Sequence, residues 1–315
     1  MKPRILFMGT PEFAVPALEM LLQEEYPLLG VVTQPDRKKG RKAQLTPPPV
    51  KIVAEKHHIP VFQPARLRDS EELEQICQLK PDLIVTAAYG QILPTTLLEV
   101  PPFRCINLHA SLLPKYRGGA PIHWAIYHGE DKTGVTIMYM EEKLDAGDML
   151  MQQSVPITTT TDVGDMYQKL SVLAADMLQE LLPRLIKGEI EPVVQDHSIA
   201  TYAPNIKRED EEIQWERTAK QIDYHIRAFC PWPGTYTYWR EKRVKVWQAI
   251  CLEQISTKIP GTVLGFSDEG IQIATGEGVL QLQELQVAGK KRMDVSQFLQ
   301  GNHLEIGERF GLWKD

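Results

Sequence analysis

The sequence CINLHASLLPKYRGGAPI, residues 105–122, decides the fold expected of this chain. A short, mainly apolar run leads into a segment rich in Gly and Pro and then into a helical pattern. This order is typical of a buried strand, a loop and a crossover helix. Asn107 and His109 lie near the end of the expected strand and, being two residues apart, point to the same side of an extended backbone. Catalytic groups of open α/β sheets sit where strands end in loops, so these two side chains are the first candidates for a site.

Both side chains have a chemical use and a plainer alternative. The amide of Asn107 can donate a hydrogen bond to a developing oxyanion, and the imidazole of His109 can move a proton near neutral pH. Taken alone, an Asn-x-His tripeptide can equally cap backbone groups of the loop. The rest of the chain has to separate these two interpretations.

The composition indicates a protein of two domains. The chain has 315 residues, of which 43% are hydrophobic, and a formal net charge of -6, so a nucleic-acid partner would have to meet a local basic patch. The first residues turn polar too early for a signal peptide, and no apolar run approaches a membrane span. The four cysteines are scattered without a Cys-x-x-Cys pair, and we therefore expect reduced thiols in a cytoplasmic protein.

Strand and helix patterns alternate from residue 4 to residue 187. Strands are expected at 4–8, 28–33, 61–62, 81–87, 105–108, 134–139 and 149–155, and helices at 13–22, 50–58, 121–128 and 163–187. This alternation predicts an α/β fold with a doubly wound parallel sheet of the Rossmann-like type. The glycine fingerprint of dinucleotide-binding proteins is absent after the first strand, which disfavours a nicotinamide-dependent dehydrogenase.

The pattern changes after residue 189. Residues 190–207 contain few apolar side chains and are expected to form a linker. Beyond it, a helix at 219–229 and five short runs at 235–239, 243–249, 261–265, 270–274 and 279–287 predict a small OB-like β-barrel. The expected organisation is a catalytic domain at 1–189, the linker, and a carboxy-terminal domain at 208–315.

A long loop rich in Gly and Pro occupies residues 34–49, and five of its residues are basic. These residues are Arg37, Lys38, Lys39, Arg41 and Lys42. Long loops in compact domains are usually functional or disordered. One interpretation is a solvated, mobile surface loop, and the other is an arm that contacts phosphate groups.

The stretch at 105–122 closely resembles the signature of formyltransferases that use 10-formyltetrahydrofolate. Asn107, His109, the loop that follows them, and Asp145 in the sequence LDAGD fall on the motif of that family. The resemblance implies that Asn107, His109 and Asp145 are catalytic, that the loop lies against the folate, and that no metal takes part. The folate-binding residues expected on this basis are Tyr89, Gly90, Ile92, Ser111, Leu112, Leu113 and Pro114.

Three further stretches resemble the members of this family that formylate initiator methionyl-tRNA. They are FMGTPEFA at 7–14, TQPDR at 33–37, and RAFCPWPG at 227–234 in the expected second domain. The implied function is transfer of the formyl group of 10-formyltetrahydrofolate to the α-amino group of methionine on that tRNA, for translation initiation. The basic loop and the second domain are then expected to bind tRNA, with Arg41 at the key basic position. We expect a monomer without a membrane partner.

The implied reaction gives each catalytic side chain a role. The amine attacks the formyl carbon, Asn107 donates to the oxyanion that forms, and a protonated His109 donates to it or delivers the proton that the folate nitrogen needs. Asp145 holds His109 as its cation and can organise a water that relays a proton. Formyl transfer to an amino sugar nucleotide would use the same core, but the basic loop disfavours it. RNA binding by an inactive enzyme core is disfavoured by the intact set of Asn, His and Asp.

Overall fold

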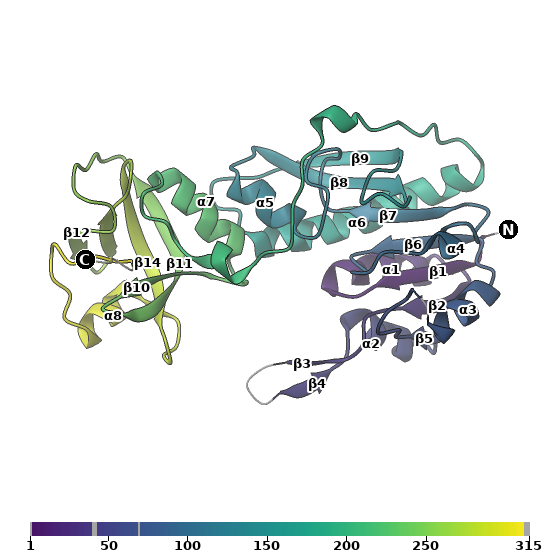
Figure 1. Cartoon of the computed structure of the whole chain (residues 1–315), viewed down its shortest axis with the longest axis horizontal. Coiled ribbons are helices and arrows are strands. Elements are labelled where there is room, and N and C mark those ends of the chain that lie inside the picture. Colours follow the sequence, from purple (N-terminus) through teal and green to yellow (C-terminus); the bar gives the residue numbers. More distant parts are fainter. Residues whose placement is uncertain (1, 40–42, 69, 312–315) are drawn as a thin grey trace. The chain divides into compact units, whose positions relative to one another are not determined.

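The computed structural model describes residues 2–39, 43–68 and 70–311 (Figure 1). The chain divides into two compact units, each described by itself here. The first unit comprises Met1–Pro121, Lys132–Pro156 and Tyr167–Pro204, and the second comprises Ile122–Asp131, Ile157–Met166 and Asn205–Asp315. The segment expected to be a linker therefore belongs to the first unit as far as Pro204. The domain limits at residues 189 and 208 stay a prediction.

A seven-stranded sheet in the order β5-β2-β1-β6-β7-β8-β9 forms the first unit. Its strands are β1 (Ile5–Gly9), β2 (Leu28–Val32), β5 (Val61–Phe62), β6 (Leu83–Ala87), β7 (Cys105–His109), β8 (Lys132–Tyr139) and β9 (Met149–Pro156). The first five strands of this order pair in parallel, which confirms the predicted α/β class and its parallel-rich sheet. β8 and β9 run antiparallel to their neighbours, and here the expectation of an all-parallel sheet needs correction. The loop at 140–148 joins them directly, and such a connection makes adjacent strands antiparallel.

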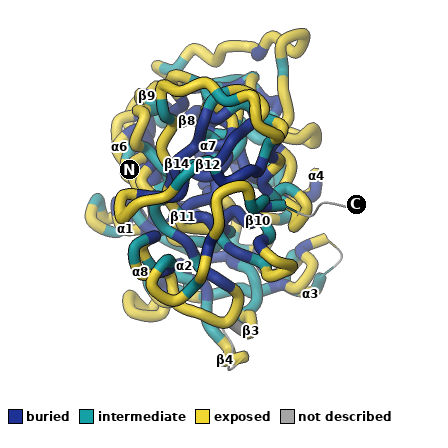
Figure 2. Tube along the Cα trace, turned by 90° about the vertical axis from the view of Figure 1, so that its left-hand side faces the viewer, coloured by how far each residue is buried: buried dark blue, intermediate teal, exposed yellow. Residues whose placement is uncertain are grey.

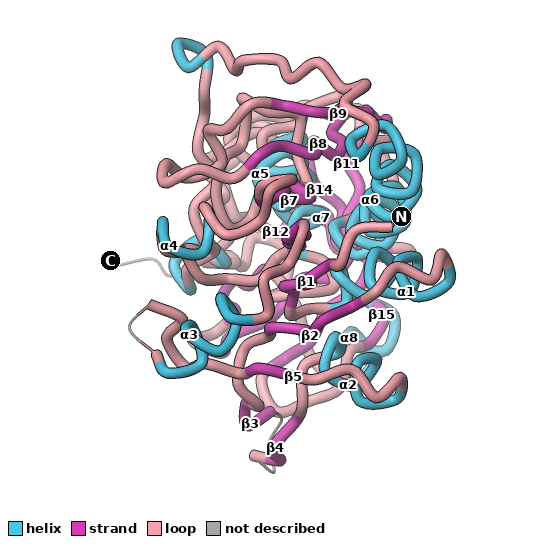
Figure 3. The backbone as a smooth tube through the Cα atoms, turned by 90° about the vertical axis from the view of Figure 1, so that its right-hand side faces the viewer, coloured by secondary structure: helices cyan, strands magenta, loops and turns pink. Residues whose placement is uncertain are grey.

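β1 and β6 are buried at every residue, because helices cover both faces of this sheet. In Figure 3, α1 (Val15–Gln23) and α2 (Pro49–Lys56) lie on one side of β1, β2 and β5, and α3 (Glu71–Gln78) lies on the other. The hydroxyl of Ser70 accepts a hydrogen bond from the Leu73 N–H and so caps the start of α3. The remaining helical elements are η1 (Glu12–Ala14), α4 (Thr95–Leu98), most of α6 (Val163–Ile186) and η2 (His197–Ile199).

The strand order reverses between β1 and β6. The chain runs from β1 outward to β2 and β5, and then returns to β6 on the other side of β1. Ligands of open α/β sheets bind beside the carboxyl ends of the strands at such a reversal. Thr10 follows β1 at this point, and its hydroxyl donates to the carbonyl of Tyr89, which follows β6, at 3.0 Å. The site of this unit is therefore expected beside the carboxyl ends of β6 and β7.

The basic loop is structured in part. Arg37–Lys39 (β3) pairs in antiparallel fashion with Gln44–Thr46 (β4), so that Arg37 lies opposite Thr46 and Lys38 opposite Leu45. A two-stranded hairpin replaces the loop predicted here, because charged residues hide the alternation of apolar and polar residues that indicates a strand. Arg41 and Lys42 lie outside the described residues.

An antiparallel sheet forms the core of the second unit, in the order β10-β11-β14-β13-β12, with β15 paired to β14. The strands are β10 (Thr235–Trp239), β11 (Lys242–Leu252), β12 (Val263–Ser267), β13 (Gly270–Ala274), β14 (Val279–Val287) and β15 (Met293–Asp294). All five predicted strands are confirmed, with changes at their ends. The tail connects the two edges of the sheet, since the Phe310 N–H donates to the Gly261 carbonyl and the Gly311 N–H to the Tyr238 carbonyl, both at 2.8 Å.

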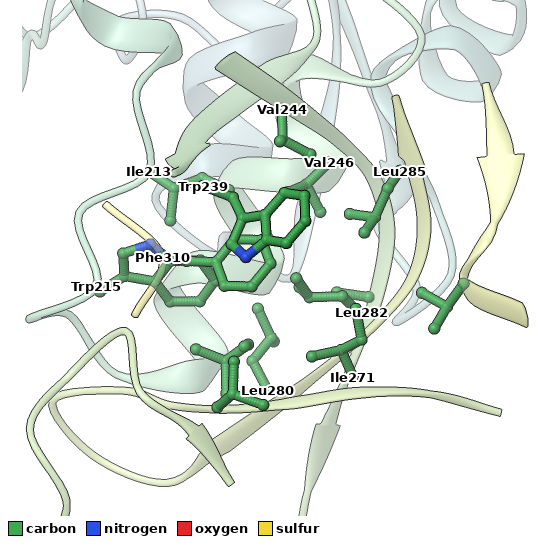
Figure 4. Close-up of a cluster of buried hydrophobic side chains, with 14 of the residues drawn as sticks. Ile213, Trp215, Trp239, Val244, Val246, Ile271, Leu280, Leu282, Leu285 and Phe310 are labelled. Carbon is green, nitrogen blue, oxygen red and sulfur yellow. The ribbon is translucent and has the colours of Figure 1, made fainter. Parts of the chain in front are cut away.

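Large apolar side chains fill the second unit. Trp215, Trp239 and Phe310 lie together on one side of Leu282 and pack in one cluster with it and other aliphatic residues of the sheet (Figure 4). The helical elements are α5 (Pro121–Tyr127), which belongs to this unit from its second residue, η3 (Arg208–Glu211), α7 (Ala219–Phe229) and α8 (Val295–Gly301). Burial follows the strands of both sheets, while most connecting segments are exposed (Figure 2). Within the described part of the chain, no helix is long and apolar enough to cross a membrane.

Candidate active site

Strand β7 carries an amide whose orientation is fixed by its neighbour. Thr86 on β6 lies opposite Asn107, and its hydroxyl donates to Asn107 Oδ1 at 2.7 Å. Thr86 is buried and Asn107 is half-buried, so this contact is partly shielded from water. The oxygen of the amide is thereby engaged, and Nδ2 is the end that can donate to a substrate oxygen.

The imidazole of His109 ends the same strand and is buried, with 6% of the residue exposed. Nε2 lies 2.9 Å from the carbonyl oxygen of Tyr116, and Nδ1 lies 3.6 Å from Oδ2 of Asp145. A carbonyl only accepts, so Nε2 carries a proton. Nδ1 is then unprotonated in the neutral ring, and it gains a proton facing the carboxylate in the imidazolium. The pair therefore provides a proton carrier beside a stabilising negative charge.

Asp145 lies in the loop at 140–148 and has a backbone φ of 47°, in the left-handed region. An Asp tolerates this region better than most residues, but the conformation persists only where the surroundings hold it. The N–H of Gly118 donates to Asp145 Oδ2 at 2.8 Å. The loops after β7 and β8 thus meet at this carboxylate.

The loop expected to lie against the folate is attached firmly to the sheet. Ser111 is buried, and its hydroxyl donates to the Lys115 carbonyl at 2.7 Å. Thr136 of β8 donates to the Ser111 carbonyl at 2.7 Å and accepts from the Leu113 N–H at 3.1 Å. Gln152 of β9 donates to the Leu113 carbonyl at 2.9 Å. Leu112 and Pro114 belong to the same anchored turn, so the loop presents one defined shape.

The other expected folate residues, Tyr89, Gly90 and Ile92, follow β6 and differ in how far they are buried. The ring of Tyr89 is buried in an apolar cluster with Leu97 and Cys105, and this burial raises the pKa of its hydroxyl. Its carbonyl accepts instead from Thr10. Gly90 has a φ of 90°, which favours glycine, and Ile92 is 69% exposed. Gly90 and the side chain of Ile92 are therefore the parts of this turn that a ligand can reach.

The base of the basic hairpin is joined to that turn by polar contacts. Lys51 Nζ lies 2.9 Å from Oδ1 of Asp36, so the ion pair links the residue before β3 to α2 after β4. Gln63 donates to both Asp36 Oδ1 and the Gln34 carbonyl, at 2.8 and 3.0 Å, and these contacts with Lys51 lower the pKa of Asp36. Gln34 in turn donates to the Tyr89 carbonyl at 3.2 Å. The hairpin that carries Arg37, Lys38 and Lys39 is thus fixed relative to the turn after β6.

The sequence predictions missed residues behind Asp145. Arg117 and Gln195 are both buried and contact each other, and Gln195 comes from the segment expected to be a linker. No sequence signal separates Gln195 from the other polar residues around it. Among the residues that the structure describes, no three His, Cys, Asp or Glu side chains are grouped as metal ligands.

Comparisons with known proteins agree on one family. A family model described as "Formyl transferase" matches residues 1–182, and one described as "Formyl transferase, C-terminal domain" matches residues 205–303. A curated methionyl-tRNA formyltransferase of Geobacillus thermodenitrificans is 54% identical over 310 residues, which cover 98% of this chain and 97% of the relative. The methionyl-tRNA formyltransferase of Bacillus subtilis is also 54% identical over 310 residues, covering 98% of each chain.

Solved structures share the fold at lower identity. An N-formyltransferase from Helicobacter canadensis, in complex with folinic acid and dTDP-3-aminofucose, has a TM-score of 0.68 at 20% identity and covers 92% of this chain and 100% of its own. HypX from Aquifex aeolicus, in complex with tetrahydrofolic acid, has a TM-score of 0.62 at 19% identity over 95% of this chain, which spans 47% of HypX.

Proposed function

The chain belongs to the formyl transferase family, and we propose that it transfers the formyl group of 10-formyltetrahydrofolate to the α-amino group of methionine on initiator methionyl-tRNA. The product, formylmethionyl-tRNA, serves translation initiation. Near full-length similarity to methionyl-tRNA formyltransferases supports this acceptor. The observation that carries the reaction type is the grouping of the oriented amide of Asn107 with the buried His109 and the half-buried Asp145.

In this proposal Asn107 stabilises the charge that builds on the formyl oxygen. Its Oδ1 is held by Thr86, and Nδ2 is left to donate to that oxygen. Preorganised donors of this kind contribute roughly 10²- to 10³-fold to the rate of acyl transfer. The donor set fits the folate substrate, which supplies a formyl group on an aniline-like nitrogen and needs no nucleophile from the protein.

His109 and Asp145 act together on the proton. The acceptor amine loses a proton when it attacks, and the free α-amino pKa of about 8 makes a strong base unnecessary. The imidazolium form of His109 has an N–H at Nδ1 that faces Asp145. It holds or delivers a proton near the reacting atoms, and Asp145 stabilises its charge.

The folate is proposed to lie against the anchored turn of Ser111, Leu112, Leu113 and Pro114 and against the turn after β6. Gly90 and Ile92 contribute from the second turn through backbone and exposed apolar surface, and Tyr89 supports this turn, because its ring is buried and its carbonyl accepts from Thr10 and Gln34. This assignment is supported by the position of both turns, beside the carboxyl ends of β6 and β7 where the strand order reverses.

The tRNA is proposed to contact the basic hairpin and the unit that follows. Arg37, Lys38, Lys39, Arg41 and Lys42 would neutralise phosphates locally on a chain whose net charge is -6. The sequence-based domain at 208–315 is assigned a tRNA-binding role. We propose a monomer that acts in the cytoplasm.

An acceptor panel tests the proposal. The protein is incubated with 10-formyltetrahydrofolate and, in separate reactions, initiator methionyl-tRNA, elongator methionyl-tRNA, glycinamide ribonucleotide and an amino sugar nucleotide. We expect formylation of initiator methionyl-tRNA and its loss in Asn107→Ala. Transfer only to a small acceptor, or transfer to the tRNA that Asn107→Ala leaves unchanged, contradicts the proposal.

A further inference from the structure

Residues 193–203, here called the strap, return from the end of α6 to the loops around Asp145. At its start, the backbone of Val193 exchanges two hydrogen bonds with Met149, each of 2.8 Å. At its end, the Arg117 N–H donates to the Thr201 carbonyl at 2.9 Å, and the Ala203 N–H donates to the Arg117 carbonyl at 2.7 Å. The strap is therefore paired to the loop after β7 as a strand would be.

One side chain of the strap reaches the loop of Asp145. Gln195 is 2% exposed, and its Nε2 donates to the carbonyls of Asp145 and Gly147 at 3.0 and 2.7 Å. Its Oε1 accepts from Arg117 Nη2 at 2.7 Å. A single buried amide thus holds two carbonyls of the loop on one side and a guanidinium on the other.

Arg117 is an unusual residue for this position, because it is only 4% exposed. Its Nη2 also lies 2.9 Å from Nδ1 of His197. Its Nε is buried without a hydrogen-bond partner among the described residues. A buried cation that is only partly satisfied is costly, which indicates that its position serves something other than stability.

The strap also packs against Gly118, which makes the second contact to the Asp145 carboxylate. Gly118, which follows Arg117, donates its N–H to Asp145 Oδ2. A Cβ at Gly118 would lie 2.7 Å from the Ala203 carbonyl of the strap, and Gly118 has a φ of 119°. The Ala203 carbonyl of the strap thus packs closely against Gly118, which binds the carboxylate, while Gln195 binds the backbone of Asp145.

We propose that Gln195 and Arg117 are positioning residues that hold Asp145 in its left-handed conformation, so that its carboxylate faces Nδ1 of His109. This inference rests on the catalytic role given to Asp145 in the proposed function. In this proposal the two residues act through Asp145 and Gly118 rather than on a substrate. Substitution of either residue would therefore lower kcat without changing the binding of either substrate.

The test compares three variants with wild type in formylation of initiator methionyl-tRNA. Gln195→Met has a similar volume and no polar atoms. Gln195→Glu still accepts from Arg117 but places a carboxylate against two carbonyls. Asp196→Asn is the control, because Asp196 is an exposed strap residue whose carboxylate accepts from the N–H and hydroxyl of Ser198 in its own turn.

We expect both Gln195 variants to lose up to about 10²-fold in kcat, the effect of a small displacement of a catalytic group. The KM values for folate and tRNA should stay within a few-fold, and Asp196→Asn should match wild type. In an Asp145→Ala background, Gln195→Met should add little, because a residue that acts through Asp145 has nothing left to position. A kcat near wild type in Gln195→Met, or an equal loss with and without Asp145, overturns the inference.

A replacement variant and a separate control outcome keep this test decisive. If Gln195→Met is not recovered folded, Gln195→Asn replaces it, since the amide is kept but is one carbon shorter. Failure of the proposed function has a different signature, because wild type would then not formylate the tRNA or Asp145→Ala would remain active. Full activity of wild type with a severe defect in Asp145→Ala isolates the role of Gln195.

Discussion

The carboxylate of Asp145 lies 3.6 Å from Nδ1 of His109. Nε2 of the same ring lies 2.9 Å from the Tyr116 carbonyl oxygen. The carboxylate therefore faces the other ring nitrogen. The amide of Asn107 lies on the same strand, two residues before the ring, with its oxygen held by Thr86. An amide that can donate and an imidazole that can carry a proton are thus presented from one strand.

Removing the amide donor should slow the chemical step. We expect Asn107→Ala to lose roughly 10²- to 10³-fold in kcat, and Asn107→Asp to lose as much, because a carboxylate has a similar shape but no N–H. Binding of tRNA should be retained, since only one amide is changed. The check is steady-state formylation beside a direct tRNA-binding measurement. Rates within a few-fold of wild type would exclude Asn107 as the oxyanion donor.

The ion pair of Asp36 and Lys51 should control how the basic hairpin meets tRNA. It joins the two ends of the hairpin at 2.9 Å, so Lys51→Asp should place two carboxylates together and displace the hairpin. We expect a raised KM for tRNA and an unchanged KM for folate. The double variant Asp36→Lys with Lys51→Asp should recover part of the loss. Equal defects in the single and double variants would show that the pair does not orient the hairpin.

Arg41 lies outside the described residues, and its prediction rests on the sequence alone. If it contacts phosphate, Arg41→Ala should weaken use of the tRNA and flatten the salt dependence by a slope of roughly 0.7 to 0.9. Arg41→Lys should recover only part of the activity, because a guanidinium grips phosphate in a fixed geometry. Formylation rates at several salt concentrations give the slopes. Unchanged slopes in both variants would make the hairpin a passive surface feature.

The second unit should lose stability in acid through a buried histidine. Burial is the main cause that lowers the pKa of His225 to about 4, while its Nε2 is bonded to the Asp210 carbonyl at 2.7 Å. The unfolded chain, with a pKa of about 6.5, binds more protons between these values. The free energy of unfolding therefore falls as pH falls from about 6.5 to about 4, by up to about 3 kcal/mol from this group.

His225→Gln keeps a donor for Asp210 but takes up no proton. We expect its unfolding free energy to depend less on pH than that of wild type between pH 6.5 and pH 4.5, measured by denaturant titration. Some dependence should remain, because burial also lowers the pKa of His123 to about 4. Parallel curves for the two proteins would contradict the assignment.

The sequence predicted the elements better than their pairing. Strong apolar runs such as 83–87 and 105–108 define strands by composition alone, and the parallel core was inferred from their alternation with helices. The direction of β8, which runs antiparallel to both β7 and β9, was missed, because the apolar runs and the connections between them do not show which way a strand runs. The hairpin of β3 and β4 was missed for a different reason, since all of its strand residues except Leu45 are polar or charged.

The candidate site shows the same limit at the level of side chains. Asn107, His109 and Asp145 were identified from motif residues, and the structure brings His109 and Asp145 together across two loops. Gln195 was not identified, because its importance comes only from contacts that tertiary structure creates. Tyr89 illustrates the converse, since a residue in the expected folate turn has its ring in the core.

The central claim is that His109 and Asp145 form one proton-carrying unit for formyl transfer to initiator methionyl-tRNA. Its most direct test is the single-turnover rate of formylmethionyl-tRNA formation for wild type, His109→Ala, Asp145→Ala and the double variant. The account predicts that each single variant loses about 10²- to 10⁴-fold and that the double variant is little slower than either. Losses that multiply fully in the double variant, or single variants as fast as wild type, would contradict it.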